Sequence, residues 1–307
     1  MYGNTIWDDI KWQYKFGSDV IKLILVNVGV FVVVQMLFLF SFLTQNSNFG
    51  DSIFSAFSLH ANLHVLLYKP WQLFTYMFLH EKFWHILWNM VALYWFGNIV
   101  GDLIGKSKVI PIYILGGLVG GFFYLTAYNL LPVFANDVNI ATAIGASAGV
   151  TAIVMAATTI SPNYEIRLFM VLNVKLKWLT AAYIFVDLIS IQYDNPGGHI
   201  AHLGGFFIGW LYIVLLRSGT DMAKPFHAVQ DFITNLFAKK SNLKVAYKNE
   251  NKQASSQTRK QTTAKQNNIN VNKQEYLDTI LDKINKSSYE SLSQEEKDFL
   301  FKVSQED

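Results

Sequence analysis

The chain has 307 residues, of which 52% are hydrophobic and 15% are charged, and its formal net charge is +3. The charge is uneven, because 21 charged residues lie in residues 1–220 and 26 lie in the last 87. The apolar runs of the first two-thirds are too extensive for the core of a soluble globular enzyme, so that class is excluded. The absence of cysteine excludes disulfide scaffolds, cysteine proteases and thiolate metal sites.

Residues 1–20 precede the first long apolar run and carry Trp7, Ile10 and Tyr14 at helical spacing. Aromatic and aliphatic side chains on one face suit a helix that lies along the membrane surface. We therefore predict an interfacial N-terminal segment.

Six apolar segments are candidates to span a membrane, because about 20 mainly apolar residues are needed to cross about 30 Å of hydrocarbon as a helix. They are residues 21–43, 84–104, 109–131, 144–160, 178–193 and 199–216. The last three are short or interrupted by polar residues, and the loop charges support them. A secretory signal is an alternative for the first run, but the run is too long and no small-residue cleavage site follows it.

The loops between these segments differ in positive charge. Lys and Arg occur in segments 105–108 and 161–177 and after the last span, whereas segments 132–143 and 194–198 have none. The positive-inside rule then places both termini in the cytoplasm and requires an even number of spans. We expect an all-α membrane protein, with a bundle of six transmembrane helices in residues 21–220.

Three segments follow the bundle. Residues 221–246 are predicted to form an amphipathic interfacial helix, and residues 247–274 a disordered basic linker. Nucleic acid is not an expected partner, because no aromatic or folded scaffold accompanies the basic charge. Residues 275–307 are predicted to form a small helical unit, in which Ser293 and Glu296 fit a capping box.

Polar residues occur near the outer ends of three spans, where lipid makes them costly. The second span opens with His85 and Asn89, the fourth with Ser147, and the sixth with His199 and His202. All three spans enter from the outer face, so at about 1.5 Å per residue these groups lie at a similar depth. A nucleophile, a base and further polar groups therefore converge from three helices.

Serine–histidine chemistry accounts for this set, since a serine hydroxyl is a poor nucleophile until a base removes its proton. His202 can take the proton of Ser147 if the fourth and sixth spans approach closely, and Gly205 and Gly209 form a small-xxx-small pair that permits this. No outer-side carboxylate stands at helical spacing from His202. We therefore expect a dyad rather than a triad, with Asp187 of the fifth span making a structural hydrogen bond.

The tetrahedral oxyanion of such a reaction needs hydrogen-bond donors. The backbone N–H of Ser147 lies at a helix start, where amides have no intrahelical partner. His85 and Asn89 stand four residues apart on one helix face and could complete the oxyanion site.

These residues also have other interpretations. His85 and Asn89 could form a packing pair, and a serine in a span often bonds its own backbone. A zinc site at His199 and His202, together with His80 and His85, lacks a nearby HExxH, so neither metal nor cofactor is expected. The Gly-x-Ser-x-Gly match to an α/β-hydrolase elbow lacks the strand that must precede it.

Over roughly residues 55–216 the chain resembles the rhomboid intramembrane serine proteases. The motifs are Pro70-Trp71-Gln72 followed by His80, His85-x-x-x-Asn89, Gly145-Ala146-Ser147, and Ala201-His202-Leu203-Gly204-Gly205-x-x-x-Gly209. The resemblance implies a six-helix bundle, a dyad of Ser147 and His202, and an oxyanion site that uses His85 and Asn89. It also implies substrates that are single-span membrane proteins, and we expect a bacterial inner membrane with the active site toward its outer face.

Three positions depart from the family pattern. Ala148 stands where a glycine usually follows the serine, and Gln72 stands where an arginine usually follows the tryptophan. Thr151 replaces an aromatic residue that many relatives stack on the catalytic histidine. The alternative function is a non-catalytic membrane-protein binder or chaperone, while a transporter lacks support from paired charges or inverted halves.

Two features could control access to the site. Segment 190–198 contains Asn195-Pro196-Gly197-Gly198, a strong turn signal, and could move as a lid above the dyad. The fifth span has few small residues and carries the bulky Phe185 and Leu188, so we expect it to pack loosely and swing aside for a substrate.

Overall fold

The computed structural model describes residues 5–168, 172–228, 276–284 and 289–303, and the chain divides into two compact units, Met1–Lys239 and Lys240–Asp307. The helices of the first unit are α1 (Ile6–Phe16), α2 (Asp19–Leu43), α3 (Ser47–Phe57), α4 (Leu63–Tyr68), α5 (Gln72–Thr75), α6 (Phe83–Ile104), α7 (Val109–Leu130), α8 (Ser147–Ile160), α9 (Leu176–Ser190) and α10 (Pro196–Arg217). Its strands are β1 (Leu59–His60), β2 (Thr142–Ala143), β3 (Glu165–Leu168) and β4 (Leu172–Lys175). Short 3₁₀ turns are η1 (Tyr76–Phe78), η2 (Lys106–Lys108) and η3 (Pro132–Phe134).

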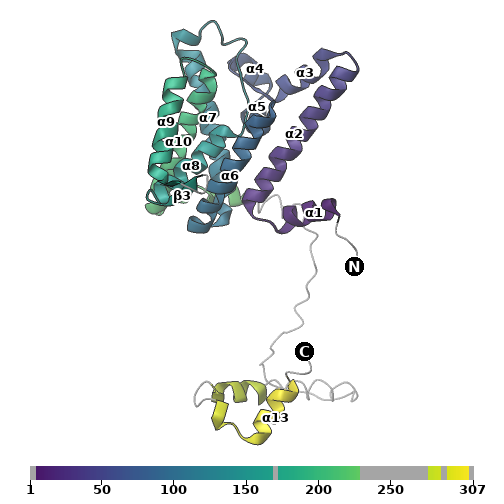
Figure 1. Ribbon diagram of the computed structural model, residues 1–307, viewed down its shortest axis with the longest axis vertical. Coiled ribbons are helices and arrows are strands. Elements are labelled where there is room, and N and C mark those ends of the chain that lie inside the picture. Colours follow the sequence, from purple (N-terminus) through teal and green to yellow (C-terminus); the bar gives the residue numbers. More distant parts are fainter. Residues whose placement is uncertain (1–4, 169–171, 229–275, 285–288, 304–307) are drawn as a thin grey trace, which may run out of the picture. The chain divides into compact units, whose positions relative to one another are not determined.

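Six helices coincide with the six predicted apolar segments, namely α2, α6, α7, α8, α9 and α10, and Figure 1 shows them as the long helices of this unit. Among the described residues, three segments are long and apolar enough to cross a membrane: Asp19–Leu43, Lys106–Leu130 and Pro196–Arg217. Helix α8 is apolar but has 14 residues. At about 1.5 Å per residue it is about 21 Å long, too short to join both surfaces of a bilayer core of about 30 Å. The count of six spans therefore stays a prediction.

Helices α7, α8 and α10 pack at close range because glycine lets their backbones touch. A Cβ added at Gly205 would lie 2.2 Å from the carbonyl oxygen of Ala148, and one at Gly209 would lie 2.2 Å from that of Ala152. A Cβ at Gly120 of α7 would lie 2.5 Å from the Cβ of Ala148. The close approach predicted from Gly205 and Gly209 is confirmed.

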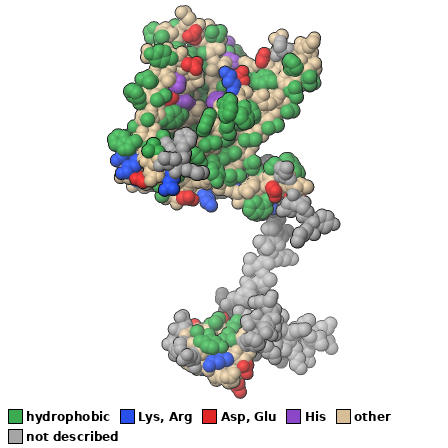
Figure 2. Space-filling model, in the orientation of Figure 1, with side chains coloured by type: hydrophobic (Ala, Val, Ile, Leu, Met, Phe, Trp, Pro, Cys, Tyr) green, Lys and Arg blue, Asp and Glu red, His purple; other side chains and the backbone are tan. Residues whose placement is uncertain are grey.

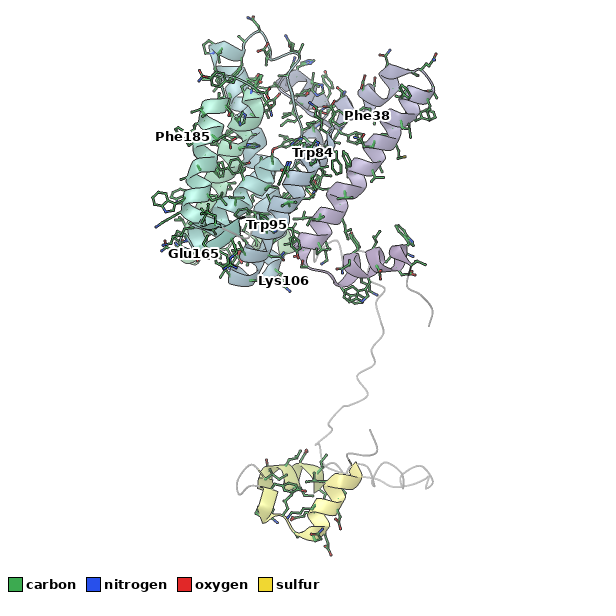
Figure 3. All side chains as sticks on the ribbon, in the orientation of Figure 1. Phe38, Trp84, Trp95, Lys106, Glu165 and Phe185 are labelled. Atoms are coloured by element: carbon green, nitrogen blue, oxygen red, sulfur yellow. The ribbon has the colours of Figure 1, made fainter. Side chains whose placement is uncertain are left out.

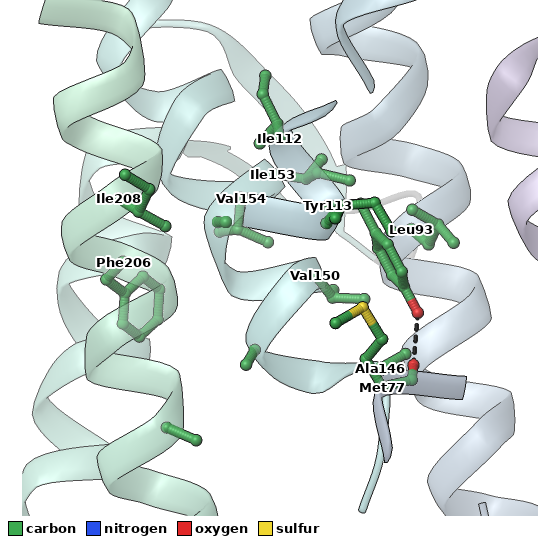
Figure 4. Close-up of a cluster of buried hydrophobic side chains, with 14 of the residues drawn as sticks. Met77, Leu93, Ile112, Tyr113, Ala146, Val150, Ile153, Val154, Phe206 and Ile208 are labelled. Atoms are coloured by element: carbon green, nitrogen blue, oxygen red, sulfur yellow. Dashed lines mark hydrogen bonds between the residues drawn. The ribbon is translucent and has the colours of Figure 1, made fainter. Parts of the chain in front are cut away.

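Buried apolar side chains fill the space between these helices (Figure 4). Within this cluster, Tyr113 of α7 is completely buried, and its hydroxyl donates a hydrogen bond of 2.6 Å to the carbonyl of Met77 (Figure 4). The amide nitrogen of Asn27 on α2 donates to the same hydroxyl at 3.3 Å. These bonds pair the polar end of a buried phenol and tie α2 and η1 to α7.

The long segment between α2 and α6 is not a plain loop, because it holds α3, β1, α4 and α5. Leu59 pairs with Ala143 and His60 with Thr142, so β1 and β2 form an antiparallel pair. This pairing connects the segment between α2 and α6 to the turn that precedes α8. The position of the start of α8 therefore depends on a contact distant in the sequence.

Gln72, which stands where the family pattern has an arginine, is completely buried. Its side-chain carbonyl accepts the backbone N–H of His60 at 3.3 Å, and its nitrogen donates to the carbonyl of Ala56 at 3.2 Å. Both ends of the amide are paired, so the loss of the cation leaves no unsatisfied group at this position.

Lys and Arg side chains gather at the end of the first unit that carries the β3–β4 hairpin and the turn between α6 and α7 (Figure 2). Lys108 of this turn pairs with Asp221, which follows α10. The hydrogen bond from Lys108 holds the pKa of the Asp221 carboxyl below its ordinary value. The ion pair fastens the end of α10 to the turn between α6 and α7.

Helix α1 begins with a capping box between Thr5 and Asp8. Its side chains Trp7, Ile10 and Tyr14 are exposed to the surroundings of the unit. Exposed aromatic side chains next to the start of an apolar helix suit a position at a membrane surface. The interfacial role of residues 1–20 stays a prediction.

In the second unit, the described residues form a helix over 276–284, a 3₁₀ turn η4 (Tyr289–Ser291) and α13 (Gln294–Val303). The backbone N–H of Ser293 donates to the Glu296 carboxylate at 2.7 Å, and that of Glu296 donates to Oγ of Ser293 at 3.3 Å. The predicted capping box is thus confirmed. The helix predicted for 221–246 is described only to residue 228, and the linker predicted for 247–274 lies outside the described residues.

Candidate active site

A cavity of about 830 Å³ lies among α6, α8, α9 and α10. It collects the four residues that the sequence assigned to catalysis and oxyanion binding, and these come from three helices. The lining residues are Glu81, Lys82, Trp84, His85, Trp88, Asn89, Ala92, Thr142, Ala143, Ile144, Ser147, Val150, Tyr183, Asp194, Asn195, Gly198 and His202. The structure therefore brings the predicted site residues together, while their catalytic roles stay predictions.

Ser147 is the first residue of α8, and Gly145 before it has a φ of +117°. A Cβ at Gly145 would lie 2.9 Å from Nε2 of His85 and 3.7 Å from Oγ of Ser147. The backbone conformation and the close ring both require glycine here. The hydroxyl of Ser147 and the imidazole of His85 thus border the small space that Gly145 leaves open, beside the unpaired amides of the first turn of α8.

His85 and Asn89 lie one turn apart on α6, as predicted from their spacing. The Asn89 side chain is 8% exposed, and its nitrogen donates a hydrogen bond of 2.9 Å to the carbonyl of His85. An amide nitrogen carries two N–H groups, so the second is left for a group inside the cavity.

His202 is held from two neighbouring helices. Thr151 of α8 is completely buried, and its hydroxyl donates to the carbonyl of His202 at 3.3 Å. The His202 ring is contacted by Tyr183 of α9, with ring centroids 6.1 Å apart and planes at 66°, and by His199, with centroids 5.8 Å apart. Tyr183 packs in turn on Phe206, with centroids 5.2 Å apart. Thr151 thus contacts the backbone of His202, and an aromatic contact with the His202 ring, which Thr151 cannot make, is made by Tyr183 of α9.

Asp187 contacts His202, although no carboxylate stands at helical spacing from that residue in the sequence. Its Oδ1 lies 2.6 Å from Nδ1 of His199 and 3.1 Å from Nδ1 of His202, and its Oδ2 lies 3.2 Å from Nδ1 of His202. The Asp187 side chain is 2% exposed. Sequence spacing on one helix could not reveal this contact, because it joins the outer part of α9 to α10.

These three side chains are also the group in the described residues whose ligand atoms could hold a metal ion. One atom from each of Asp187, His199 and His202 lies within 4.8 Å of the others. The hydrogen bonds between the carboxylate and Nδ1 of each imidazole already pair these atoms with one another. The expectation that no metal is needed stays a prediction.

His80, a residue of the family motif, lies in the segment just before α6 and is completely buried. Burial, together with the neighbouring His85, lowers the pKa of His80 to about 3. Its Nε2 accepts the backbone N–H of Ala146 at 3.3 Å, which requires the neutral ring. His80 therefore helps to hold in place the turn that leads to Ser147.

Helix α9 turns Tyr183 toward the cavity and exposes Phe185 and Leu188. Phe185 is 64% exposed and Leu188 is 51% exposed, and Figure 3 shows Phe185 on the outer side of α9. These two side chains therefore do not hold α9 against the bundle, and the loose packing and movement of α9 stay predictions. The turn between α9 and α10 forms where predicted, with Asn195 at a φ of +44° and its side chain accepting the N–H of Gly198 at 3.2 Å.

Residues 68–219 match the family model described as the rhomboid domain. The chain is 27% identical over 213 residues to RHOMBOID-like protein 12, mitochondrial, of Arabidopsis thaliana, which covers 65% of this chain and 59% of that protein. It is 27% identical over 143 residues to Rhomboid protein 1, mitochondrial, of Saccharomyces cerevisiae, which covers 44% of this chain and 38% of that protein. It is 33% identical over 58 residues to Rhomboid protease GlpG of Salmonella newport, which covers 19% of this chain and 21% of that protein.

The chain thus spans less than two thirds of the length of each of these relatives. The shared region contains α6, α8, α9 and α10, which line the cavity. The apolar helices of the chain, together with the matched domain, identify the protein as an integral membrane protein. The chain belongs to the rhomboid family.

Proposed function

We propose that this protein is an intramembrane serine endopeptidase that cleaves single-span membrane proteins in or near their transmembrane segment. The observation that carries this proposal is the cavity in which Ser147, His202, His85 and Asn89 meet. A serine and a histidine near the ends of apolar helices have no evident structural need for a cavity of about 830 Å³ that both side chains line.

In the proposed reaction, His202 acts as the base and Ser147 as the nucleophile. Nε2 of His202 takes the hydroxyl proton while Oγ of Ser147 bonds to the scissile carbonyl carbon. Collapse of the tetrahedral intermediate breaks the C–N bond, and His202 returns the proton to the leaving amine. A water molecule then attacks the acyl group in the same way, and this step releases the new carboxyl end and restores the Ser147 hydroxyl.

The negative charge of the intermediate needs donors that are already in position. The free N–H of the Asn89 amide, the His85 imidazole and the backbone N–H of Ser147 are the candidates. All three border the space next to Gly145 or line the same cavity. The small size of Gly145 keeps that space open for the oxyanion.

The proposed topology has six spans, both termini in the cytoplasm and the active site toward the outer face. The gathering of Lys and Arg at the end of the unit opposite the cavity supports this orientation (Figure 2). The expected bacterial inner membrane is not supported by the relatives, because the two with the longest matched regions carry mitochondrial names.

A reconstituted assay tests the function. The purified protein in liposomes should cleave a model single-span substrate, and Ser147→Ala and His202→Ala should each abolish cleavage. A fluorophosphonate probe should label the wild-type protein on Ser147 and fail to label Ser147→Ala. Substrate binding without cleavage or labelling would instead identify the protein as a membrane-protein binder or chaperone.

A further inference from the structure

The carboxylate of Asp187 is shared by two histidines of α10. His199 and His202 are three residues apart, so their rings lie on the same face of that helix. Both present Nδ1 to Asp187, at 2.6 Å and 3.1 Å from Oδ1. With 2% of the side chain exposed, this carboxylate depends on these partners for its hydrogen bonds.

An ionised carboxylate only accepts hydrogen bonds, so a histidine nitrogen bonded to it must carry the proton. For His202, the proton then lies on Nδ1, and Nε2 keeps its lone pair. Nε2 is the atom that must be unprotonated to take a proton from Ser147. The contact with Asp187 therefore selects the tautomer that the proposed reaction requires.

Resting on the function proposed above, we propose that Asp187 is a positioning residue of the active site, which turns the pair of Ser147 and His202 into a serine–histidine–aspartate triad. Asp187 holds the proton of His202 on Nδ1 and stabilises the imidazolium that forms when Nε2 accepts the serine proton. The carboxylate itself takes no proton. His199 donates the second hydrogen bond and keeps the carboxylate turned toward His202.

A purely structural role for Asp187 would be to fasten α9 to the bundle. Helix α9 has a separate polar tie for this purpose, a hydrogen bond of 2.6 Å between Thr180 and Thr158 of α8. Thr180 is as buried as Asp187, at 2% exposure. Because it bonds α8 and not His202, Thr180 offers a matched control for the loss of a buried α9 contact.

The first experiment compares Asp187→Asn, Thr180→Val and the wild type in the liposome cleavage assay with EDTA present. Asparagine keeps the shape of the side chain but no longer selects the His202 tautomer. We expect kcat to fall about 10²- to 10⁴-fold in Asp187→Asn, with KM and the thermal midpoint close to wild type. Thr180→Val should lower the thermal midpoint and leave kcat within about threefold of wild type.

The second experiment reads the tautomer without using activity. Nitrogen NMR of imidazole-labelled protein, with the His202 signal identified by its loss in His202→Gln, should show the proton on Nδ1. In Asp187→Asn the same signal should report a larger share of the Nε2–H form. His199→Gln should leave the proton of His202 on Nδ1, because the contact between Asp187 and His202 remains.

Each outcome bears on one proposal. A wild-type enzyme that cleaves in a Ser147-dependent manner, together with an Asp187→Asn variant at full kcat, overturns the positioning role and leaves the protease function standing. Equal losses of kcat in Asp187→Asn and Thr180→Val, or loss of wild-type cleavage in EDTA, also overturn it. A His202 proton on Nε2 in the wild type overturns it even if Asp187→Asn fails to fold. A wild-type protein without Ser147-dependent chemistry removes the protease function, which the NMR result does not address.

Discussion

The hydroxyl of Thr151 on α8 donates a hydrogen bond of 3.3 Å to the backbone carbonyl of His202 on α10. The same hydroxyl donates to the carbonyl of Ala148 at 2.9 Å, so it is shared between its own helix and the neighbouring one. Ser147 lies about one turn from Thr151 on α8. The bond therefore fixes the position of the proposed base, His202, along the helix axes relative to the proposed nucleophile, Ser147.

Thr151→Val keeps the volume of this side chain and removes its hydroxyl. We expect the free energy of unfolding to fall by about 1 kcal/mol, because a buried carbonyl of α10 loses a donor. We also expect kcat to fall several-fold, as measured by the liposome assay. Thr159→Val is the control, since the Thr159 hydroxyl bonds the carbonyl of Met155 on its own helix. Equal kcat in both variants would show that the contact does not position His202.

Gly205→Ala should separate α10 from α8. The added Cβ would lie 2.2 Å from both the carbonyl oxygen of Ala148 and Oγ1 of Thr151, so the backbones must move apart. We expect a loss of about 1–3 kcal/mol in the free energy of unfolding and a large loss of fluorophosphonate labelling. Gly29→Ala on α2 is the control, because nothing lies within 4 Å of its added Cβ. Normal labelling of Gly205→Ala would mean that the helices accommodate the methyl group without moving the dyad.

Asn89→Ala should affect turnover more than substrate binding. Its second N–H would matter mainly for the charge of the transition state, so we expect kcat to fall about 10²- to 10³-fold with little change in KM. Asn98→Ala is matched to it, because Asn98 lies on the same helix and also donates to the carbonyl four residues before it, at 2.8 Å. An unchanged kcat in Asn89→Ala would reduce Asn89 to a packing residue.

The stability of the protein should decrease as the pH falls below about 6.5, partly because of His80. Burial lowers the folded-state pKa of His80 to about 3, below the ordinary histidine value. Between these values the unfolded chain binds a proton that the folded protein does not, so stability is present above about pH 6.5 and is lost toward pH 3. The contribution amounts to about 2 kcal/mol between pH 7.5 and pH 5.

The test of this pH dependence is unfolding in detergent micelles at both pH values. His80→Gln should reduce the difference between pH 7.5 and pH 5, although it lowers the stability at pH 7.5. His64→Gln, at an exposed histidine, should leave the difference unchanged. A His80→Gln protein with the wild-type pH dependence would show that His80 is protonated in the folded state.

A transmembrane substrate is expected to pass between α6 and α9, because Trp84 and Trp88 of α6 and Tyr183 of α9 line the cavity. The chain has no cysteine, so Trp84→Cys and Val186→Cys can be joined specifically by a bifunctional maleimide. The joined protein should lose cleavage of a membrane-embedded substrate and keep labelling by the small fluorophosphonate. Cleavage at the full rate after joining would place the entrance elsewhere. Phe185→Ala should leave cleavage unchanged, since that side chain is exposed.

Sequence patterns predicted what depends on one helix at a time. The position of Ser147 at the start of its helix, and of His85 and Asn89 one turn apart, follows from spans of known direction and constant rise. Gly205 and Gly209 predicted a close helix pair because small residues four positions apart on one helix face let two helix backbones approach.

What the sequence could not predict depends on how one helix is turned relative to another. Asp187 and His202 meet across α9 and α10, and no spacing within either helix contains that information. The same holds for the aromatic side chain beside His202. It comes from Tyr183 on α9 instead of from position 151 on α8, and this too depends on how the two helices are turned. Short elements such as β1 carry too few residues for a period to be recognised, so the sequence predicts only a loop before α6.

The pairing of Leu59 with Ala143 has a consequence for the biogenesis of the protein. The turn that leads to Ser147 is fastened to a strand made much earlier, and His202 is synthesised only after Ser147. A ribosome-bound chain that has inserted α8 thus carries its proposed nucleophile without its base, and without the carboxylate of Asp187. The proposed proteolytic activity can be acquired only when α10 packs against α8, so we expect a nascent chain that ends before α10 to be inactive.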